Sequence, residues 1–474
     1  MSRADPSEAS ATETAHLFAA GGRRLLAGIV SVILLIAFEA MAVATVMPRA
    51  VADLHGLAFY AWAFTGYVVA SLFAMVVAGQ ACDRGGPRKP LLGGVALFTA
   101  GLVVAGTAVD MGVFVLGRAL QGLGGGAVVV ALYVVVARAY DETVRPRVFA
   151  VMSSAWVLPS IVGPAVAGLV ADRFSWRWVF LAAAVFVVPA VAVMWGVLPA
   201  FADVGGPPRS GRRRAAAMVA AGVAGLQYAG QRLDAVGALV GLAGVGLLAP
   251  SLHRLLPAGT LRLARGLPTV IAMRGVLAGA FFGAETFIPL MLVSERHLST
   301  TAAGLSLTGG AVGWAVGSWF QGRPGTTVPR FRLVQSGCVL VALGIGGIAL
   351  VTVASVPAWL AVLAWAVGGA GMGMSMASVS VLMLELSPAP EQGANSAAMQ
   401  VADALFSVVF IGVAGAVFAS AARRTGGQQT WAFVVIDAVM AALALAGAAA
   451  ATRIRTRPTL RAGAPVRRAA PGAS

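Results

Sequence analysis

The chain has 474 residues, of which 59% are hydrophobic and 11% are charged, and its mean hydropathy is +0.87. This composition excludes a soluble globular protein, because such proteins carry about twice that share of charged residues. The net charge of +16 does not indicate a nucleic-acid partner, because the arginines lie between apolar runs rather than in one tail or patch.

Apolar runs long enough to cross a bilayer core of about 30 Å recur along the chain. They predict membrane helices near 25–48, 58–81, 90–109, 111–137, 148–171 and 178–198, and a second set near 269–293, 302–321, 333–354, 358–386, 394–421 and 431–452. Two weaker runs, near 215–230 and 235–252, lie between the sets, and Gln227 is inside the first of them. This pair forms either two extra membrane helices or re-entrant or surface helices.

The distribution of basic residues predicts the orientation of the helices. With the N-terminus inside, most of the 34 Lys and Arg residues fall in cytoplasmic segments, and the outer segments hold Arg49, Arg173, Arg177, Arg232, Arg296, Arg423 and Arg424. We therefore expect the chain to lie in the inner (cytoplasmic) membrane of the cell, with both termini in the cytoplasm. The predicted organisation is a polar tail (1–24), a six-helix bundle (25–198), a linker with two extra helices (199–268), a second six-helix bundle (269–452) and a basic tail (453–474).

A short charged segment joins the second and third predicted helices. It reads Gly79-x-x-x-Asp83-Arg84-x-Gly86-x-Arg88-Lys89, and it resembles the loop between helices two and three of major facilitator superfamily transporters. The resemblance implies two six-helix bundles that rock around a central cavity. It also implies that this charge cluster latches one conformation by contacting a neighbouring helix end. A weaker echo, with Gln321 at the position of Asp83, lies after the eighth predicted helix of that fold.

The fourth predicted helix carries a charge at membrane depth, Arg118, followed by Gln121 and Gly122. Because an Arg facing lipid costs at least about 2.5 kcal/mol, we expect this one to face the bundle interior. The Arg-x-x-Gln-Gly-x-Gly spacing resembles the fourth-helix signature of the same superfamily, which implies a role in proton coupling. Arg118 also lies near the outer end of the predicted helix. A simpler interpretation is therefore open, in which its side chain extends to the membrane surface.

The fifth predicted helix contains a Pro and Gly pattern that resembles the antiporter signature of the superfamily. The pattern is Pro159, Gly163, Pro164 and Gly168, with Pro159 and Ala167 at positions where the signature has Gly. Pro164 is expected to bend the helix, and the glycines to let another helix approach closely. In the second half, Gly309, Gly313 and Gly317 repeat every four residues, and we expect that ladder to face the fifth helix.

Carboxylates at membrane depth are the candidates for a proton site. Glu39 in the first helix and Glu285 in the related helix of the second half lie mid-span, and Asp403 lies in a later helix. A buried carboxyl can load and release protons because burial penalises its charged form. The apolar neighbours Phe38, Met41, Phe282 and Phe287 are expected to line the substrate cavity beside Glu39 and Glu285.

The sequence lacks the motifs of metal sites, disulfide frameworks and nucleotide-binding loops. The four His residues and two Cys residues are scattered, so no metal cluster or disulfide is predicted, and there is no phosphate-binding loop. We expect neither a cofactor nor an enzymatic activity.

Together the motifs resemble the fourteen-helix drug:proton antiporter branch of the superfamily. The resemblance implies a monomeric exporter of amphipathic or cationic small molecules, driven by protons. The alternatives are a proton symporter or facilitator of a metabolite, sugar or lipid, and a non-transporting membrane scaffold.

Overall fold

The computed structural model describes residues 20–140, 148, 151–152, 155–195, 212–232, 234–323, 328–388, 391–424 and 429–454. Within these residues every regular element is a helix, so the predicted all-helical fold class is confirmed. Nine of the described helices are long and apolar enough to cross a membrane. Apolar runs of this length favour helices because a helix satisfies its own backbone hydrogen bonds where water is absent.

The first bundle consists of helices in the order that the sequence predicts. They are α2 (Ala20–Asp53), α3 (Tyr60–Gly85), α4 (Arg88–Gly106), α5 (Met111–Ala139), α7 (Val157–Arg173) and α8 (Arg177–Trp195), with a short 3₁₀ turn η1 (Leu57–Phe59). Residues 79–85 of the charged segment, which was expected to be a loop, form the end of α3, and Gly86 is the C-cap of that helix. That residue has φ of +72°, a conformation that favours glycine at the end of a helix.

The second bundle follows the same order. Its helices are α11 (Leu267–Glu285), α12 (Ile288–Ser294), α13 (Thr300–Gln321), α14 (Arg330–Val351), α15 (Leu360–Leu386), α16 (Gln392–Arg424) and α17 (Thr430–Ala450), followed by a 3₁₀ turn η4 (Ala451–Ile454). The predicted span 269–293 is interrupted at 286–287, between α11 and α12. The bundles meet where α7 packs on α13, where α3 packs on α16, and where α2 packs on α12 and α13.

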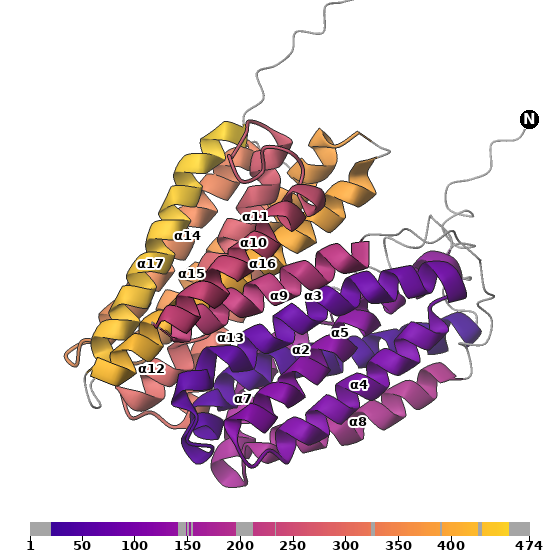
Figure 1. Ribbon diagram of the computed structural model, residues 1–474. Coiled ribbons are helices and arrows are strands. Elements are labelled where there is room, and N and C mark those ends of the chain that lie inside the picture. Colours follow the sequence, from indigo (N-terminus) through magenta and orange to yellow (C-terminus); the bar gives the residue numbers. More distant parts are fainter. Residues whose placement is uncertain are drawn as a thin grey trace, which may run out of the picture.

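The extra pair consists of α9 (Arg212–Gln231) and α10 (Ala235–Leu255), which pack against each other. Figure 1 shows α9 alongside α3, with the two bundles diverging toward the upper right. An apolar cluster joins α9 to both bundles, because Val219 and Val223 pack with Leu72 of α3 and Leu405 of α16. The pair therefore bridges the two bundles rather than standing apart from them.

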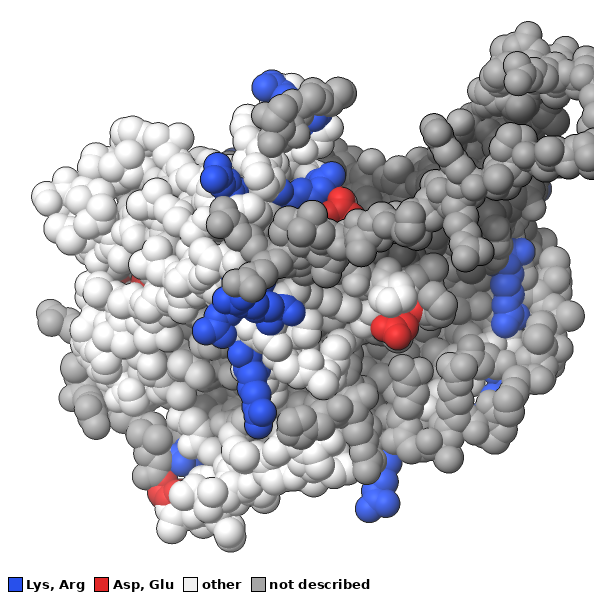
Figure 2. All heavy atoms as spheres, turned by 90° about the horizontal axis from the view of Figure 1, so that it is seen from above, with Lys and Arg blue, Asp and Glu red and all other residues white. Residues whose placement is uncertain are grey.

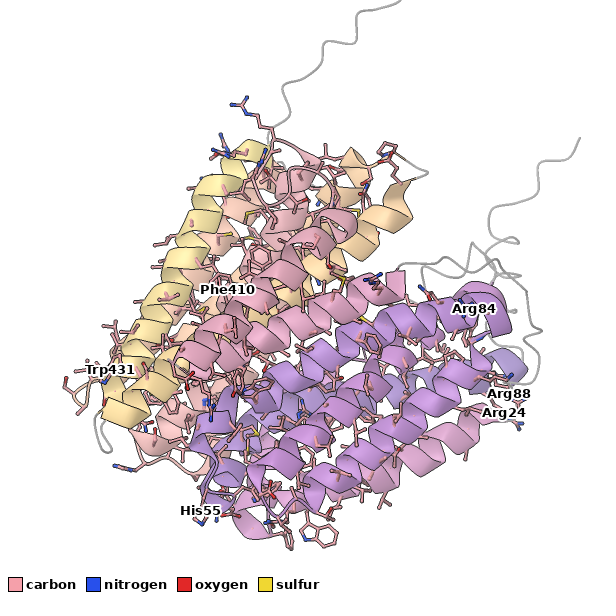
Figure 3. All side chains as sticks on the ribbon, in the orientation of Figure 1. Arg24, His55, Arg84, Arg88, Phe410 and Trp431 are labelled. Atoms are coloured by element: carbon pink, nitrogen blue, oxygen red, sulfur yellow. The ribbon has the colours of Figure 1, made fainter. Side chains whose placement is uncertain are left out.

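The labelled charged residues and His55 of the first bundle lie at its two ends (Figure 3). Figure 3 shows Arg24, Arg84 and Arg88 together at one end of the first bundle and His55 at the opposite end. Figure 2, in which the molecule is seen from above, shows larger areas of Lys and Arg than of Asp and Glu. We call the ends near His55, which the sequence places away from the cytoplasm, the outer ends.

Labelling can test whether α9 and α10 cross the membrane. Arg232 is exposed between them, and two crossings would place it outside. In a chain whose Cys82 and Cys338 are replaced by Ala, we expect Arg232→Cys to react with a membrane-impermeant maleimide only from outside. Arg214→Cys, at the start of α9, is the matched control and should react only from the cytoplasm. Reaction of both from the cytoplasm would replace the fourteen-helix topology with a twelve-helix one.

Candidate functional site

A buried charge cluster joins α2 and α5 inside the first bundle. Glu39 and Arg118 are 2% and 3% exposed, so neither side chain reaches lipid or the membrane surface. Nη1 of Arg118 donates to Oε1 of Glu39 and to Oε1 of Gln121, and its Nε donates to the carbonyl oxygen of Ala63 at 2.9 Å. The guanidinium also lies 4.6 Å from the ring centroid of Tyr67. The sequence-predicted residues Glu39, Arg118 and Gln121 therefore lie in one cluster.

Two polar atoms of this cluster are buried without a partner in the described residues. They are Oε2 of Glu39 and Nε2 of Gln121. Oε2 is the one carboxylate oxygen of the cluster that no protein donor occupies, which makes it the atom able to accept a proton. Protonation of Oε2 would remove the negative charge that Arg118 faces. The buried guanidinium would then have no counter-charge, which changes the stability of the cluster.

The second bundle has a corresponding cluster between α11 and α15, in which the carboxyl group contacts a neutral donor instead of an arginine. Trp365 donates from Nε1 to Oε1 of Glu285 at 3.3 Å, and its ring stacks on Phe281 with centroids 4.3 Å apart. Glu285 thus has an indole donor where Glu39 has a guanidinium. Sequence reasoning missed Trp365, because a Trp in an apolar helix gives no signal that distinguishes a hydrogen-bond donor from a packing residue.

Asp403 of α16 pairs with Arg274 of α11. The Nη2 to Oδ2 distance is 2.8 Å, and both side chains are about a fifth exposed. The sequence marked Asp403 as a proton-coupling candidate and did not connect it with Arg274. This ion pair is separate from Glu285, and the second bundle also buries Asp437 of α17.

The loop-motif residues lie together at the cytoplasmic end of the first bundle. Arg84, Arg88 and Lys89 are exposed, and a Cβ at Gly79 would meet Val130 at an ordinary contact distance of 3.8 Å. The side chain of Asp83 lies outside the described residues. The latch contact expected from the sequence therefore stays a prediction.

Glycines of the fourth and fifth predicted helices allow close helix contacts. A Cβ at Gly122 would lie 2.2 Å from the carbonyl oxygen of Tyr67, so α5 and α3 can pack only with Gly there. Gly163 faces Phe38 and Met41 of α2, whereas Gly168 faces α13. Pro159 is buried, and Pro164 lies inside α7 beside Gly304 of α13.

The expectation for the glycine ladder of α13 was wrong. Gly309, Gly313 and Gly317 pack on the backbone of α15, where an added Cβ would approach Val362, Ala366 and Ala370. The face of α13 that meets α7 carries Thr301, Gly304 and Thr308 instead. The ladder identified a close contact, but four-residue spacing does not specify which neighbouring helix makes it.

The outer ends of the bundles are joined by a contact that the sequence analysis missed. Oδ2 of Asp172, at the end of α7, accepts from the backbone N and Oγ1 of Thr301 at 2.9 and 2.6 Å, and Oδ1 pairs with Arg49 at 3.0 Å. We call Asp172, Thr301 and Arg49 the outer contact. Burial alone would raise the pKa of Asp172, but the hydrogen bonds from Thr301 and Thr300 outweigh it and lower the pKa. A lowered pKa means that the contact is complete near neutral pH and is lost only as pH falls through the lowered value.

Removing the Asp172 carboxylate should let the outer ends part more often. Thr308 donates to the carbonyl oxygen of Ile161 at 3.0 Å, inside the α7–α13 interface, so Thr308→Cys reports on opening. In a cysteine-free chain we expect Asp172→Ala to raise external labelling of this cysteine severalfold. Asp110→Ala is the control, because Asp110 caps its own helix α5. Equal labelling in both variants would remove the gating role of Asp172.

The four predicted cavity residues lie in different surroundings. Phe38 and Met41 face Gly163, and Phe282 lies near Phe281 and Trp314. Phe287 is buried in a ring cluster with Tyr60 and Phe418, and Tyr60 donates to the carbonyl oxygen of Thr286 at 2.8 Å. Phe287 thus belongs to the contact between the bundles. Within the described chain, no group of three or more potential metal ligands is present.

Comparison with known proteins identifies the family. The family model of the Major Facilitator Superfamily matches residues 29–411. The chain belongs to this superfamily. This superfamily consists of multi-pass membrane transporters, and the many apolar helices of the chain agree with that class.

Relatives of known sequence include transporters of Mycobacterium tuberculosis (strain ATCC 25618 / H37Rv). One, an uncharacterized MFS-type transporter, is 29% identical over 321 residues, covering 63% of this chain and 45% of that protein. The match thus spans less than half the length of that relative. Another, named a probable multidrug-efflux transporter, is 27% identical over 401 residues, covering 79% of this chain and 83% of that protein.

A third relative is the multidrug transporter protein MdtP of Bacillus subtilis (strain 168). It is 30% identical over 156 residues, which cover 33% of this chain and 29% of that protein. Among solved structures, peptide transporter POT in complex with alafosfalin has a TM-score of 0.68 at 16% identity, covering 95% of this chain and 99% of that one. An auto inhibited POT family peptide transporter has a TM-score of 0.67 at 16% identity, with coverage of 92% and 98%. Likeness at this identity shows the fold alone.

Proposed function

We propose that this transporter exports amphipathic or cationic small molecules in exchange for protons, by alternating access between the two bundles. The observation that carries the proposal is the Glu39–Arg118 pair, which is buried inside the first bundle and leaves Oε2 of Glu39 without a donor. An ionisable pair at membrane depth is costly to maintain, which favours a functional role over a structural one. The names of two relatives, which refer to multidrug transport, support the same class of cargo.

In this mechanism a proton binds Oε2 of Glu39, and the carboxyl loses its charge. Arg118 then keeps Gln121 and the carbonyl oxygen of Ala63 as acceptors. Proton binding and cargo binding are linked because each changes the stability of the same charge cluster. Glu285, in the corresponding helix of the second bundle, provides a second carboxyl whose ionised form attracts a cation.

Proton movement in reconstituted vesicles tests this proposal directly. Vesicles hold a pH-sensitive dye, and each compound of a panel is added outside at equal starting pH. Antiport moves protons out as cargo enters, so the interior should become alkaline. Acidification would instead indicate a proton symporter, and the absence of any response across a broad panel would favour a facilitator or a scaffold.

We further propose that Asp83, with Arg84 and Arg88, latches one conformation at the cytoplasmic end. An interaction present in one conformation alone shifts the equilibrium between the two. Asp83→Asn should then keep expression and membrane insertion but reduce transport strongly, whereas Asp234→Asn, on the exposed turn between α9 and α10, should not. Equal transport by the Asp83→Asn variant and the unmodified protein, at matched protein levels, would remove this role.

We propose that the transporter acts as a monomer in the inner membrane, with residues 25–198 and 269–452 as the moving bundles and with both termini in the cytoplasm. Residues 199–268 would then include α9 and α10, and the apolar cluster that these helices share with α3 and α16 supports a role in holding the bundles together.

A further inference from the structure

An apolar cavity of about 650 Å³ lies between α2, α7 and α8, on the side of the first bundle. Its walls include Phe38, Val166, Phe174, Trp178, Ala182 and Phe186, and every lining residue is apolar. Phe174, Trp178 and Phe186 are 78%, 56% and 61% exposed, so the cavity is open at the protein surface. We call it the lateral groove.

The lateral groove follows the depth of one membrane leaflet. Trp178 and Phe186 are separated by about 12 Å along α8, at about 1.5 Å per residue, which approaches half of a hydrocarbon core about 30 Å thick. Phe174 and Trp178 lie at the outer ends of α7 and α8, whereas Phe38 lies near the middle of α2. The groove thus extends from the outer surface toward the midplane.

An exposed cation precedes the groove residue Phe174 in the sequence, at the outer end of α7. Arg173, the last residue of α7, immediately precedes Phe174 and is exposed, and it has no hydrogen-bond or ion-pair partner among the residues that the structure describes. Neighbouring arginines are occupied: Arg49 pairs with Asp172, and Arg177 contacts Asp53 and the carbonyl oxygen of Ala108. Arg173 is therefore available for an anion at the depth of lipid headgroups.

We propose that the lateral groove binds one phospholipid of the outer leaflet that has an anionic headgroup. One acyl chain occupies the groove, and the phosphate contacts Arg173. The apolar lining, the length of one leaflet and the exposed cation next to Phe174 match the acyl chain, its length and the anionic headgroup of such a lipid. Transported cargo is a poorer match, because the only polar group on the lining side chains is the indole N–H of Trp178, and no charged group is present to orient a cation.

The bound lipid would touch the transport machinery. Phe38 is a wall of the groove and directly precedes Glu39, and α7 carries both groove residues and Asp172 of the outer contact. A chain that fills the groove supports the packing of α2, α7 and α8 beside the charge cluster. This inference does not depend on the direction of transport or on proton coupling.

Lipid retention by the purified protein tests the proposal. The protein is extracted from nanodiscs that contain equal amounts of phosphatidylglycerol and phosphatidylcholine, and bound lipid is measured by native mass spectrometry. We expect the unmodified protein to retain phosphatidylglycerol in preference. Arg173→Gln should reduce that preference about fivefold, which corresponds to about 1 kcal/mol for one Arg near an anionic surface. Arg232→Gln, also exposed and outside in the predicted topology, should not change it.

Filling the groove provides the second arm of the test. Ala182→Trp should abolish retention of both lipids, whereas Val185→Trp should have no effect, because Val185 is 68% exposed on the same helix and does not line the groove. Val166→Trp, from α7, replaces Ala182→Trp if that variant fails to fold. Unchanged retention in the groove-filling variants, or an equal loss in Val185→Trp, would mean that only the general lipid annulus had been measured and would overturn the proposal.

Discussion

Replacing Arg118 with Ala is expected to abolish proton-driven accumulation of cargo while the protein still inserts into the membrane. The reason lies in the environment of Glu39, which is 2% exposed and has Arg118 as its cationic partner. Removing one member of a buried pair costs about 3–5 kcal/mol if the other stays charged. Glu39 avoids that cost by keeping its proton, so it can no longer release the proton during the cycle. Uptake into vesicles that carry an imposed pH gradient measures the loss.

Two further variants separate coupling from folding. Glu39→Gln should lose proton-driven accumulation in the same way, and it should still exchange neutral cargo between equal compartments. The double variant Glu39→Gln, Arg118→Ala leaves no unpaired carboxylate, so we expect it to be at least as well expressed as Arg118→Ala. If Glu39→Gln, Glu285→Gln still moved cargo uphill on a pH gradient, coupling would have to reside elsewhere, and Asp403 with Arg274 would be the next pair to test.

Sequence predicted those features that depend on local pattern. Apolar runs located the helices, and Gly86 marked the end of α3 because its backbone has a positive φ. The cost of exposing a charge to lipid predicted that Arg118 faces the bundle interior, and in the structure Arg118 is buried there against Glu39. Its role in proton coupling stays a prediction.

Features that depend on which helices are neighbours were not predictable from sequence. Arg274 and Asp403 are 129 residues apart, and nothing in either helix alone specifies that α11 lies against α16. Asp172 resembles a solvated residue at a helix end, and its partner is the first turn of α13, in the other bundle. The Ser-Thr-Thr segment at 299–301, a pattern typical of helix starts, was the available signal. It indicated a capped helix but not the cross-bundle carboxylate.

Adding one methyl group at Gly168 should block closure of the outer ends. A Cβ there would lie 2.5 Å from Cα and 2.9 Å from N of Thr301. These are backbone atoms, which cannot move aside by a side-chain rotation, so α7 and α13 must separate and the bonds from Thr301 to Asp172 must lengthen. In this structure the outer ends of the two bundles are in contact, and Gly168→Ala should disfavour that conformation.

We therefore expect Gly168→Ala to reduce transport more than tenfold and to increase external labelling of Thr308→Cys. Gly346→Ala is the matched control, because a Cβ at Gly346 of α14 would have no heavy atom within 4 Å. It changes the same residue type inside a helix, so it measures the general effect of replacing a helical glycine by Ala, which by itself is favourable for the helix. A Gly168→Ala variant that transported at the rate of the control, with unchanged labelling, would show that the α7–α13 interface does not close as tightly during transport as it does in this structure, and the outer contact would then lose its place in the cycle.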